Sequence, residues 1–134
     1  MSPLSSPTRT ILPLIFLVLA GCSAPKPVVL TAADNRRTVE ITRGADLLVS
    51  LESNRTTGFS WTLAGAMSGP LAVVGEPIYV TDPASTGALG VGGIETWRFR
   101  AASPGEQRLQ FEYRRPTEKE LTPERSVTID VRVR

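Results

Sequence analysis

The sequence predicts an all-β protein, a β-sandwich of seven to eight antiparallel strands. Three observations carry this prediction. Apolar and polar residues alternate with period two in one segment after another. Clusters of Gly, Pro, Asn, Asp and Ser separate these segments, and no stretch shows a helical period. The chain has 134 residues, of which 41% are hydrophobic, so it is long enough for one domain with a core. A small closed barrel is the alternative arrangement.

Five strands are predicted before the glycine-rich loop at 82–93. In one of them, Leu47, Val49 and Leu51 share a face because side chains alternate along a strand. Turn-forming pairs such as Arg43-Gly44 and Gly69-Pro70 end strands or begin them. In chain order, the five predicted strands cover residues 39–41, 47–51, 59–63, 71–74 and 78–81.

Three more strands complete the prediction, at 94–101, 109–113 and 127–133. Each has one apolar face, and that number of strands fills two sheets packed face to face. Trp61 matches the core Trp of immunoglobulin-like sandwiches. No disulfide can join the sheets, because the chain has a single Cys.

The composition excludes most enzyme classes and predicts no cofactor. The chain has no His, so it holds neither a Ser-His-Asp triad nor a His-ligated metal. An enzyme would need a Ser-Lys pair built on Lys26 or Lys119, and neither lies in a convincing setting. If Arg9 is removed with a leader, 14 basic residues face 13 acidic ones, and no basic stripe predicts a nucleic-acid partner.

The first residues predict an export signal. Arg9 precedes an apolar run at 11–20, which is about half the length that crosses a ~30 Å bilayer core. Leu19-Ala20-Gly21-Cys22 resembles a bacterial lipobox, in which the Cys is lipidated. We therefore expect a lipoprotein signal peptide at 1–21, a lipidated tether at 22–35 and the folded domain at 36–134.

By the same resemblance, Ser23 lacks the acidic side chain of an inner-membrane retention signal. This indicates a lipid anchor in the outer membrane of the bacterial envelope. The alternative is an ordinary signal peptide followed by a chance Cys.

Three loops are chemically unusual. The first, Asn54-Arg55-Thr56-Thr57-Gly58, is polar and leads into the aromatic residues Phe59 and Trp61. The second, at 87–93, is rich in glycine. No helix or Lys-Ser/Thr pair follows it, so phosphate binding is disfavoured. We interpret its glycines as bare backbone that the main chain of another protein can approach closely. The alternative is a flexible loop without a binding role. The third, at 113–119, holds Pro116, which stiffens its tip. Asn54-Arg55-Thr56 is also a glycosylation sequon, which we discount for a bacterial chain.

Together these residues resemble the chagasin family of papain-like cysteine peptidase inhibitors. That family carries N-x-T-T-G-[FY]-x-W, G-x-G-G and R-P-W in this order. The stretch 54–61 matches every fixed position of the first pattern, and Gly90-Val91-Gly92-Gly93 matches the second. Arg115-Pro116 matches the start of the third, but Thr117 stands where the family has Trp.

The resemblance implies a reversible, non-covalent inhibitor that binds a papain-like peptidase with three loops. A monomer is the default expectation, since the sequence does not decide the oligomeric state. Thr56 and Thr57 would cover the catalytic Cys of the peptidase. Gly90 to Gly93 would pair by main chain with the wall of its cleft, and Arg115 and Pro116 would contact the opposite side. The alternative is an envelope lipoprotein that uses the sandwich only as a binding or structural module.

Overall fold

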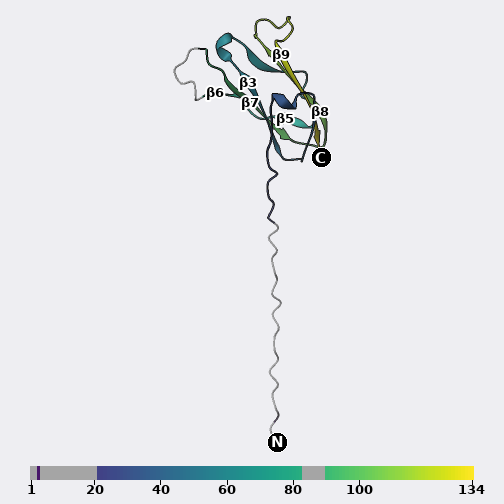
Figure 1. Cartoon of the computed structure of the whole chain (residues 1–134). Helices are drawn as coiled ribbons and strands as arrows, with labels where there is room; N and C mark the ends of the chain where they lie inside the picture. The colour runs from purple at the N-terminus through teal and green to yellow at the C-terminus, as the bar shows by residue number, and fades with distance from the viewer. Residues whose placement is uncertain (1–2, 4–20, 83–89) are drawn as a thin grey trace.

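A computed structural model describes residue 3, residues 21–82 and residues 90–134 (Figure 1). Within these residues the chain forms nine strands and two short 3-10 helices. In order they are β1 (Val28–Leu30), η1 (Ala32–Asp34), β2 (Thr38–Ile41), β3 (Asp46–Ser53), η2 (Arg55–Thr57), β4 (Ser60–Ala64), β5 (Leu71–Val73), β6 (Ile78–Thr81), β7 (Gly93–Ala101), β8 (Gly105–Arg114) and β9 (Arg125–Val133).

The strands form two sheets, as the alternating pattern predicted. One sheet has the order β1-β3-β7-β5, with β6 also paired to β7, and the other has the order β2-β9-β8-β4. The prediction of antiparallel strands alone was wrong. β1 pairs with β3 in parallel and β2 pairs with β9 in parallel, while the remaining pairs are antiparallel. Both sheets are therefore mixed.

The core lies between the sheets and consists of the residues that alternate along each strand. In β9 the predicted apolar face is buried throughout, from Val127 to Val133. Phe99 from one sheet meets Phe111 from the other at a centroid distance of 6.2 Å. The predicted core Trp, Trp61, is also buried, at 4% exposure. Burial of these side chains gives the sandwich most of its stability.

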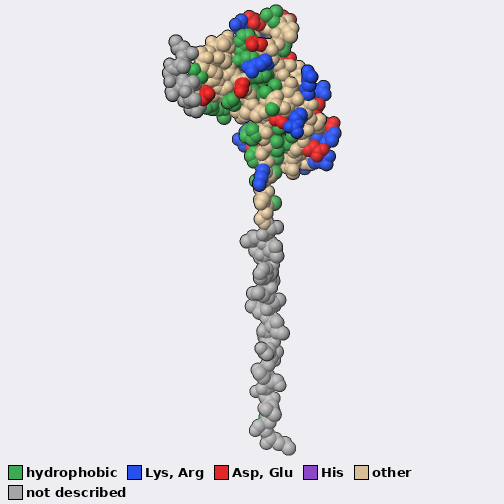
Figure 2. Space-filling view, in the orientation of Figure 1, with side chains coloured by type: hydrophobic (Ala, Val, Ile, Leu, Met, Phe, Trp, Pro, Cys, Tyr) green, Lys and Arg blue, Asp and Glu red, His purple; other side chains and the backbone are tan. Residues whose placement is uncertain are grey.

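The outer face of the second sheet is covered with paired charges. Arg132 lies between Glu106 and Glu40, and Arg134 also pairs with Glu40. Figure 2 shows cationic and acidic side chains intermixed on this part of the surface. Exposed pairs of this kind contribute little to stability individually.

The folded domain begins earlier than the sequence predicted. Residues 28–34, which we assigned to the tether, form β1 and η1, and Leu30 is 4% exposed in the core. A capping box fixes η1, because the Thr31 side chain accepts from the Ala33 amide and Asp34 accepts from the Thr31 amide. Three residues are too few to show an alternating pattern, and nearby Pro25 and Pro27 suggested an extended tether.

The first loop and the N-terminal segment lie at opposite ends of the sandwich. β3 runs from Asp46 to Ser53 and leads into η2. Because β1 runs parallel to β3, residues 21–27 leave the domain at the end opposite to η2 (Figure 1). The predicted signal peptide lies outside the described residues except at residues 3 and 21, and Cys22 is exposed. Among the described residues, no helix has the length and apolar character to span a membrane.

Candidate functional site

The first loop is a single 3-10 turn that its own sequence stabilises. Asn54 caps η2, and its Oδ1 accepts hydrogen bonds from the Thr56 amide at 3.2 Å and from Thr56 Oγ1 at 2.5 Å. Thr57 Oγ1 donates to the Asn54 carbonyl at 2.6 Å. Gly58 ends the turn at φ 79°, a left-handed conformation that favours glycine. Asn, Thr, Thr and Gly are therefore the residue types that this turn requires.

An aromatic cluster supports the turn from below. The Phe59 and Tyr113 rings stack at 5.4 Å, and Trp61 lies 5.1 Å from Tyr113. Tyr113 Oη accepts from the Asn54 amide at 2.8 Å, and Trp61 Nε1 donates to the Glu52 carbonyl at 2.9 Å. The Arg125 guanidinium lies 4.2 Å from the Tyr113 ring centroid. The turn therefore rests on a rigid base from β4, β8 and β9.

The second loop is joined to the first by Asn54. Its Nδ2 donates to the Gly90 carbonyl at 3.0 Å. A Cβ on Gly93 would lie 2.3 Å from the Val80 carbonyl oxygen, so packing against β6 explains this glycine without any partner protein. Gly92 is less confined, since its Cβ would lie 3.5 Å from the Ser53 carbonyl oxygen. Residues 87–89 of the predicted loop lie outside the described residues.

The third loop contacts the first from the other side. Arg115 Nε donates to the Thr57 carbonyl at 3.4 Å, and the guanidinium lies 4.6 Å from the Phe59 ring centroid. Glu118 holds the same guanidinium in an ion pair at 3.2 Å. Pro116 and Thr117 are exposed at the tip. The structure thus places residues from all three predicted loops around η2, at one end of the sandwich.

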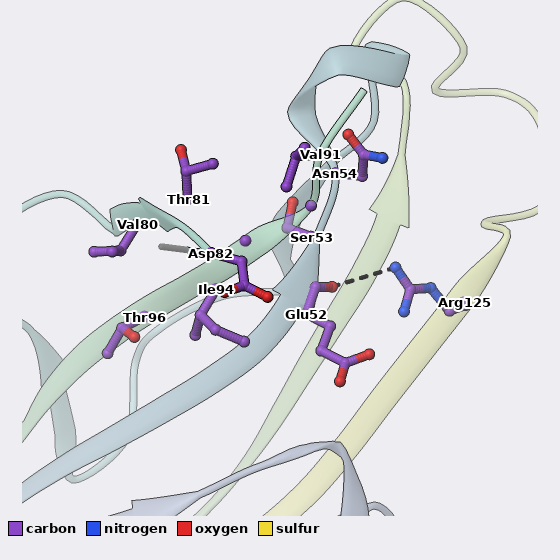
Figure 3. A pocket seen from close by; sticks show the side chains of 12 residues that line it. Glu52, Ser53, Asn54, Val80, Thr81, Asp82, Val91, Ile94, Thr96 and Arg125 are labelled. Atoms are coloured by element: carbon purple, nitrogen blue, oxygen red, sulfur yellow. Dashed lines mark hydrogen bonds between the residues drawn. The ribbon is translucent and has the colours of Figure 1, made fainter. Parts of the chain in front are cut away.

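A hollow of about 610 Å³ lies beside the first two loops. Figure 3 shows Asn54 and Val91 at its loop end, with Val80 and Ile94 from the neighbouring strands β6 and β7. On the other side, Arg125 donates to the Glu52 carbonyl at 3.2 Å. This end of the molecule offers hydroxyl groups, main chain and apolar side chains to a partner.

Three residues that contact the loops or the cluster beneath them were not singled out from the sequence. Tyr113 ends the predicted strand at 109–113, but nothing in the sequence predicted that its hydroxyl oxygen accepts from the Asn54 amide. Arg125 covers the aromatic cluster from the start of β9. Glu95 is 1% exposed and pairs with Arg55. Glu95 lies two residues before Trp97 and so shares its face of the strand, and an acidic residue on that apolar face was the available signal.

No group of three or more His, Cys, Asp or Glu side chains is arranged for a metal ion within the described ranges. The hydroxyl groups of the exposed residues Thr56 and Thr57 each form a hydrogen bond within the turn. The arrangement suits binding through shape and hydrogen bonds.

In sequence, this chain is similar to known peptidase inhibitors. A family model described as chagasin family peptidase inhibitor I42 matches residues 40–133. Amoebiasin-1 of Entamoeba histolytica is 31% identical over 87 residues, which cover 65% of this chain and 81% of that protein.

Two solved structures have the same fold. The crystal structure of the cysteine protease inhibitor EhICP2 from Entamoeba histolytica superposes with a TM-score of 0.72 at 23% identity, covering 81% of this chain and 96% of that one. PbICP-C, solved in complex with falcipain-2, superposes with a TM-score of 0.54 at 20% identity. That match covers 81% of this chain and 99% of PbICP-C.

Proposed function

This chain belongs to the chagasin family of peptidase inhibitors, and we propose that its three loops block the active-site cleft of a papain-like cysteine peptidase. One observation carries the choice of loops. Hydrogen bonds from Asn54 to Gly90 and from Arg115 to Thr57 join three distant motifs into one surface. The protein acts as an inhibitor and not as an enzyme. The proposed inhibition is reversible and non-covalent, because loops that fill the cleft block it without forming a bond to the catalytic Cys.

The proposed roles follow the positions of the loops. Thr56 and Thr57 are exposed on η2, at the centre, and would cover the catalytic Cys of the peptidase. The main chain at Gly90 to Gly92 would pair with one wall of the cleft, and Arg115 with Pro116 would contact the other. Gly93, also expected to take part, already pairs with Ser53 and Thr81 inside its own sheet. Because the turn is already fixed by internal hydrogen bonds, binding orders few groups, and this lowers its entropic cost.

The same hydrogen bonds explain how the inhibitor would escape cleavage. A scissile carbonyl must accept hydrogen bonds from the oxyanion hole of the enzyme. In the first loop the Asn54 carbonyl accepts from Thr57, the Arg55 carbonyl from Gly58 and the Thr57 carbonyl from Arg115. Three carbonyls of the turn and its cap therefore already have donors, and the backbone between them is closed rather than extended.

Titration of purified residues 23–134 against papain tests the proposal. We expect stoichiometric, reversible loss of activity, and we expect Thr56→Arg to abolish it, because a long cation would replace a small side chain at the centre of the surface. Thr38→Arg is the matched control, because exposed Thr38 lies in β2, outside the loop surface. Full inhibition by Thr56→Arg would refute the proposed role of this loop. A wild-type chain without effect on papain or a cathepsin L-like enzyme would favour the binding module.

We further propose that Cys22 carries a lipid anchor in the outer membrane of a bacterial cell. Two facts support this. The sequence Leu19-Ala20-Gly21-Cys22 has lipobox form, and Cys22 is exposed on the segment that leaves the domain. Cys22→Ser should move the protein from the membrane fraction to the soluble fraction, and unchanged membrane association would contradict the anchor.

A further inference from the structure

Arg55 is the one residue of η2 at a variable position of the N-x-T-T-G pattern, and it does not point freely into solvent. Its guanidinium lies 4.8 Å from the Tyr79 ring centroid. One of its nitrogens lies 3.5 Å from Glu95 Oε2. Tyr79 and Glu95 are register partners on β6 and β7. Arg55 therefore connects the first loop to the sheet that does not contain Tyr113.

Glu95 is an unusual residue to find between two sheets. Its side chain is 1% exposed, and Oε2 makes no hydrogen bond within the described residues. In that part of the chain, Arg55 is its one ion-pair partner. A buried carboxylate without a nearby cation is strongly unfavourable. The carboxylate consequently favours the loop conformation in which the Arg55 guanidinium lies against it.

We propose that Glu95 is a positioning residue for inhibition. It holds Arg55, and through Arg55 it fixes the 3-10 turn in the conformation that enters the peptidase cleft. This inference rests on the proposed function of the loop. The turn is then held from both sheets, by Glu95 and Tyr79 on one side and by Tyr113 and Arg115 on the other.

Arg55 acts on the turn through the main chain. It is the first residue of η2, and its carbonyl accepts from the Gly58 amide at 3.1 Å. The next bond in the turn runs from the Thr57 amide to the Asn54 carbonyl at 3.2 Å. If the guanidinium loses its partner, both bonds should open more often. Exchange of the Thr57 and Gly58 amide hydrogens with solvent reports this opening.

Glu95→Gln is the direct test, because it keeps the size of the side chain and removes its charge. We expect exchange at Thr57 and Gly58 to become about 10-fold faster and the inhibition constant for papain to rise about 10-fold, the cost of ordering one freed Arg side chain. The melting temperature should stay equal or rise, since an amide is less costly to bury than a carboxylate. A role in stability alone would lower the melting temperature instead.

Two further variants sharpen the result. Arg55→Gln should cause changes in exchange and inhibition at least as large, since it also removes the contact with the Tyr79 ring. Adding Glu95→Gln to it should change neither readout further, because the ion pair is already absent. Glu106→Gln is the matched control. It removes an exposed carboxylate paired with Arg132 on β9, so neither readout should change.

Unchanged exchange and inhibition in Glu95→Gln would overturn the inference, as would weaker inhibition that appears only together with a lower melting temperature. Failure of the proposed function is a separate result. If the wild-type chain does not inhibit papain, amide exchange at Thr57 and Gly58 still decides whether Glu95 fixes the turn.

Discussion

Asn54 uses its main chain and both polar atoms of its side chain to assemble the site. Its amide N–H donates to Tyr113 Oη, its Nδ2 donates to the Gly90 carbonyl, and its Oδ1 caps η2 by accepting from Thr56. An amide side chain combines a donor and an acceptor, whereas an ionised Asp has only acceptors. The first position of the motif therefore needs Asn specifically.

Asn54→Asp should separate these two tasks. The cap is retained, but the bond to Gly90 is replaced by two facing acceptors, so the second loop should move away from the first. We expect a loss of about 1 kcal/mol in unfolding free energy and an inhibition constant about 10-fold higher. Urea unfolding and papain titration measure the two effects. Asn35→Asp is the control, because Asn35 Oδ1 only accepts, from the Thr128 amide. Equal inhibition by Asn54→Asp and wild type would contradict this role.

Thr117 is the residue at which the chain departs from the family pattern. It is exposed next to Pro116, and a small side chain there contributes little contact area. Aromatic residues at interface centres are typical hot spots, each worth about 2 kcal/mol or more. Thr117→Trp should therefore tighten papain inhibition about 30-fold. An unchanged or higher inhibition constant would argue against placing this loop in the cleft.

At the scale of elements, the sequence predicted the strands from β2 to β9 to within a few residues at each end. It succeeded because one apolar face per strand is a local signal. The parallel pairing of β1 with β3 and of β2 with β9 was not predictable in this way, because alternation shows which face is buried and not which strand lies beside it. That the three loops lie together was expected only from the family resemblance, and not from the alternating pattern. The contacts of Tyr113 and Glu95 with the first loop become visible only in the folded structure.

The missed strand β1 leads to a prediction about the domain boundary. A chain trimmed to residues 36–134 loses Leu30 from the core together with η1. We expect it to be less stable than residues 23–134 by about 2 kcal/mol or more, the value of one buried Leu. A chain trimmed to 27–134 keeps β1 and serves as the control. Equal urea midpoints for all three chains would show that β1 contributes nothing.

At the scale of the whole molecule, the site and the proposed anchor lie at opposite ends. Residues 21–27 leave the sandwich at the start of β3, and η2 follows the end of β3 (Figure 1). A protein anchored through Cys22 would therefore present its loops away from the membrane. This orientation leaves the proposed surface open to a peptidase arriving from solution.

Charge pairing on the outer faces makes stability depend on pH. Hydrogen bonds from Arg98, assisted by Arg100, lower the pKa of Asp46, and a hydrogen bond from Arg108 lowers the pKa of Asp130. Since the folded-state pKa lies below the unfolded value of about 4, this stabilisation is present above that value and is lost as the pH falls through the folded pKa. Asp46→Asn should reduce the loss of stability on acidification, measured as the urea midpoint between about pH 5 and pH 2. Parallel curves for Asp46→Asn and wild type would contradict the assignment.

Protection of the catalytic thiol of papain tests the central claim most directly. Iodoacetamide alkylates that thiolate, and the inhibitor would prevent this only if it covers the cleft. One equivalent of residues 23–134 should slow alkylation in proportion to the loss of activity, and full activity should return when the complex dissociates. A bound complex in which the thiol is alkylated at the unprotected rate would contradict the account.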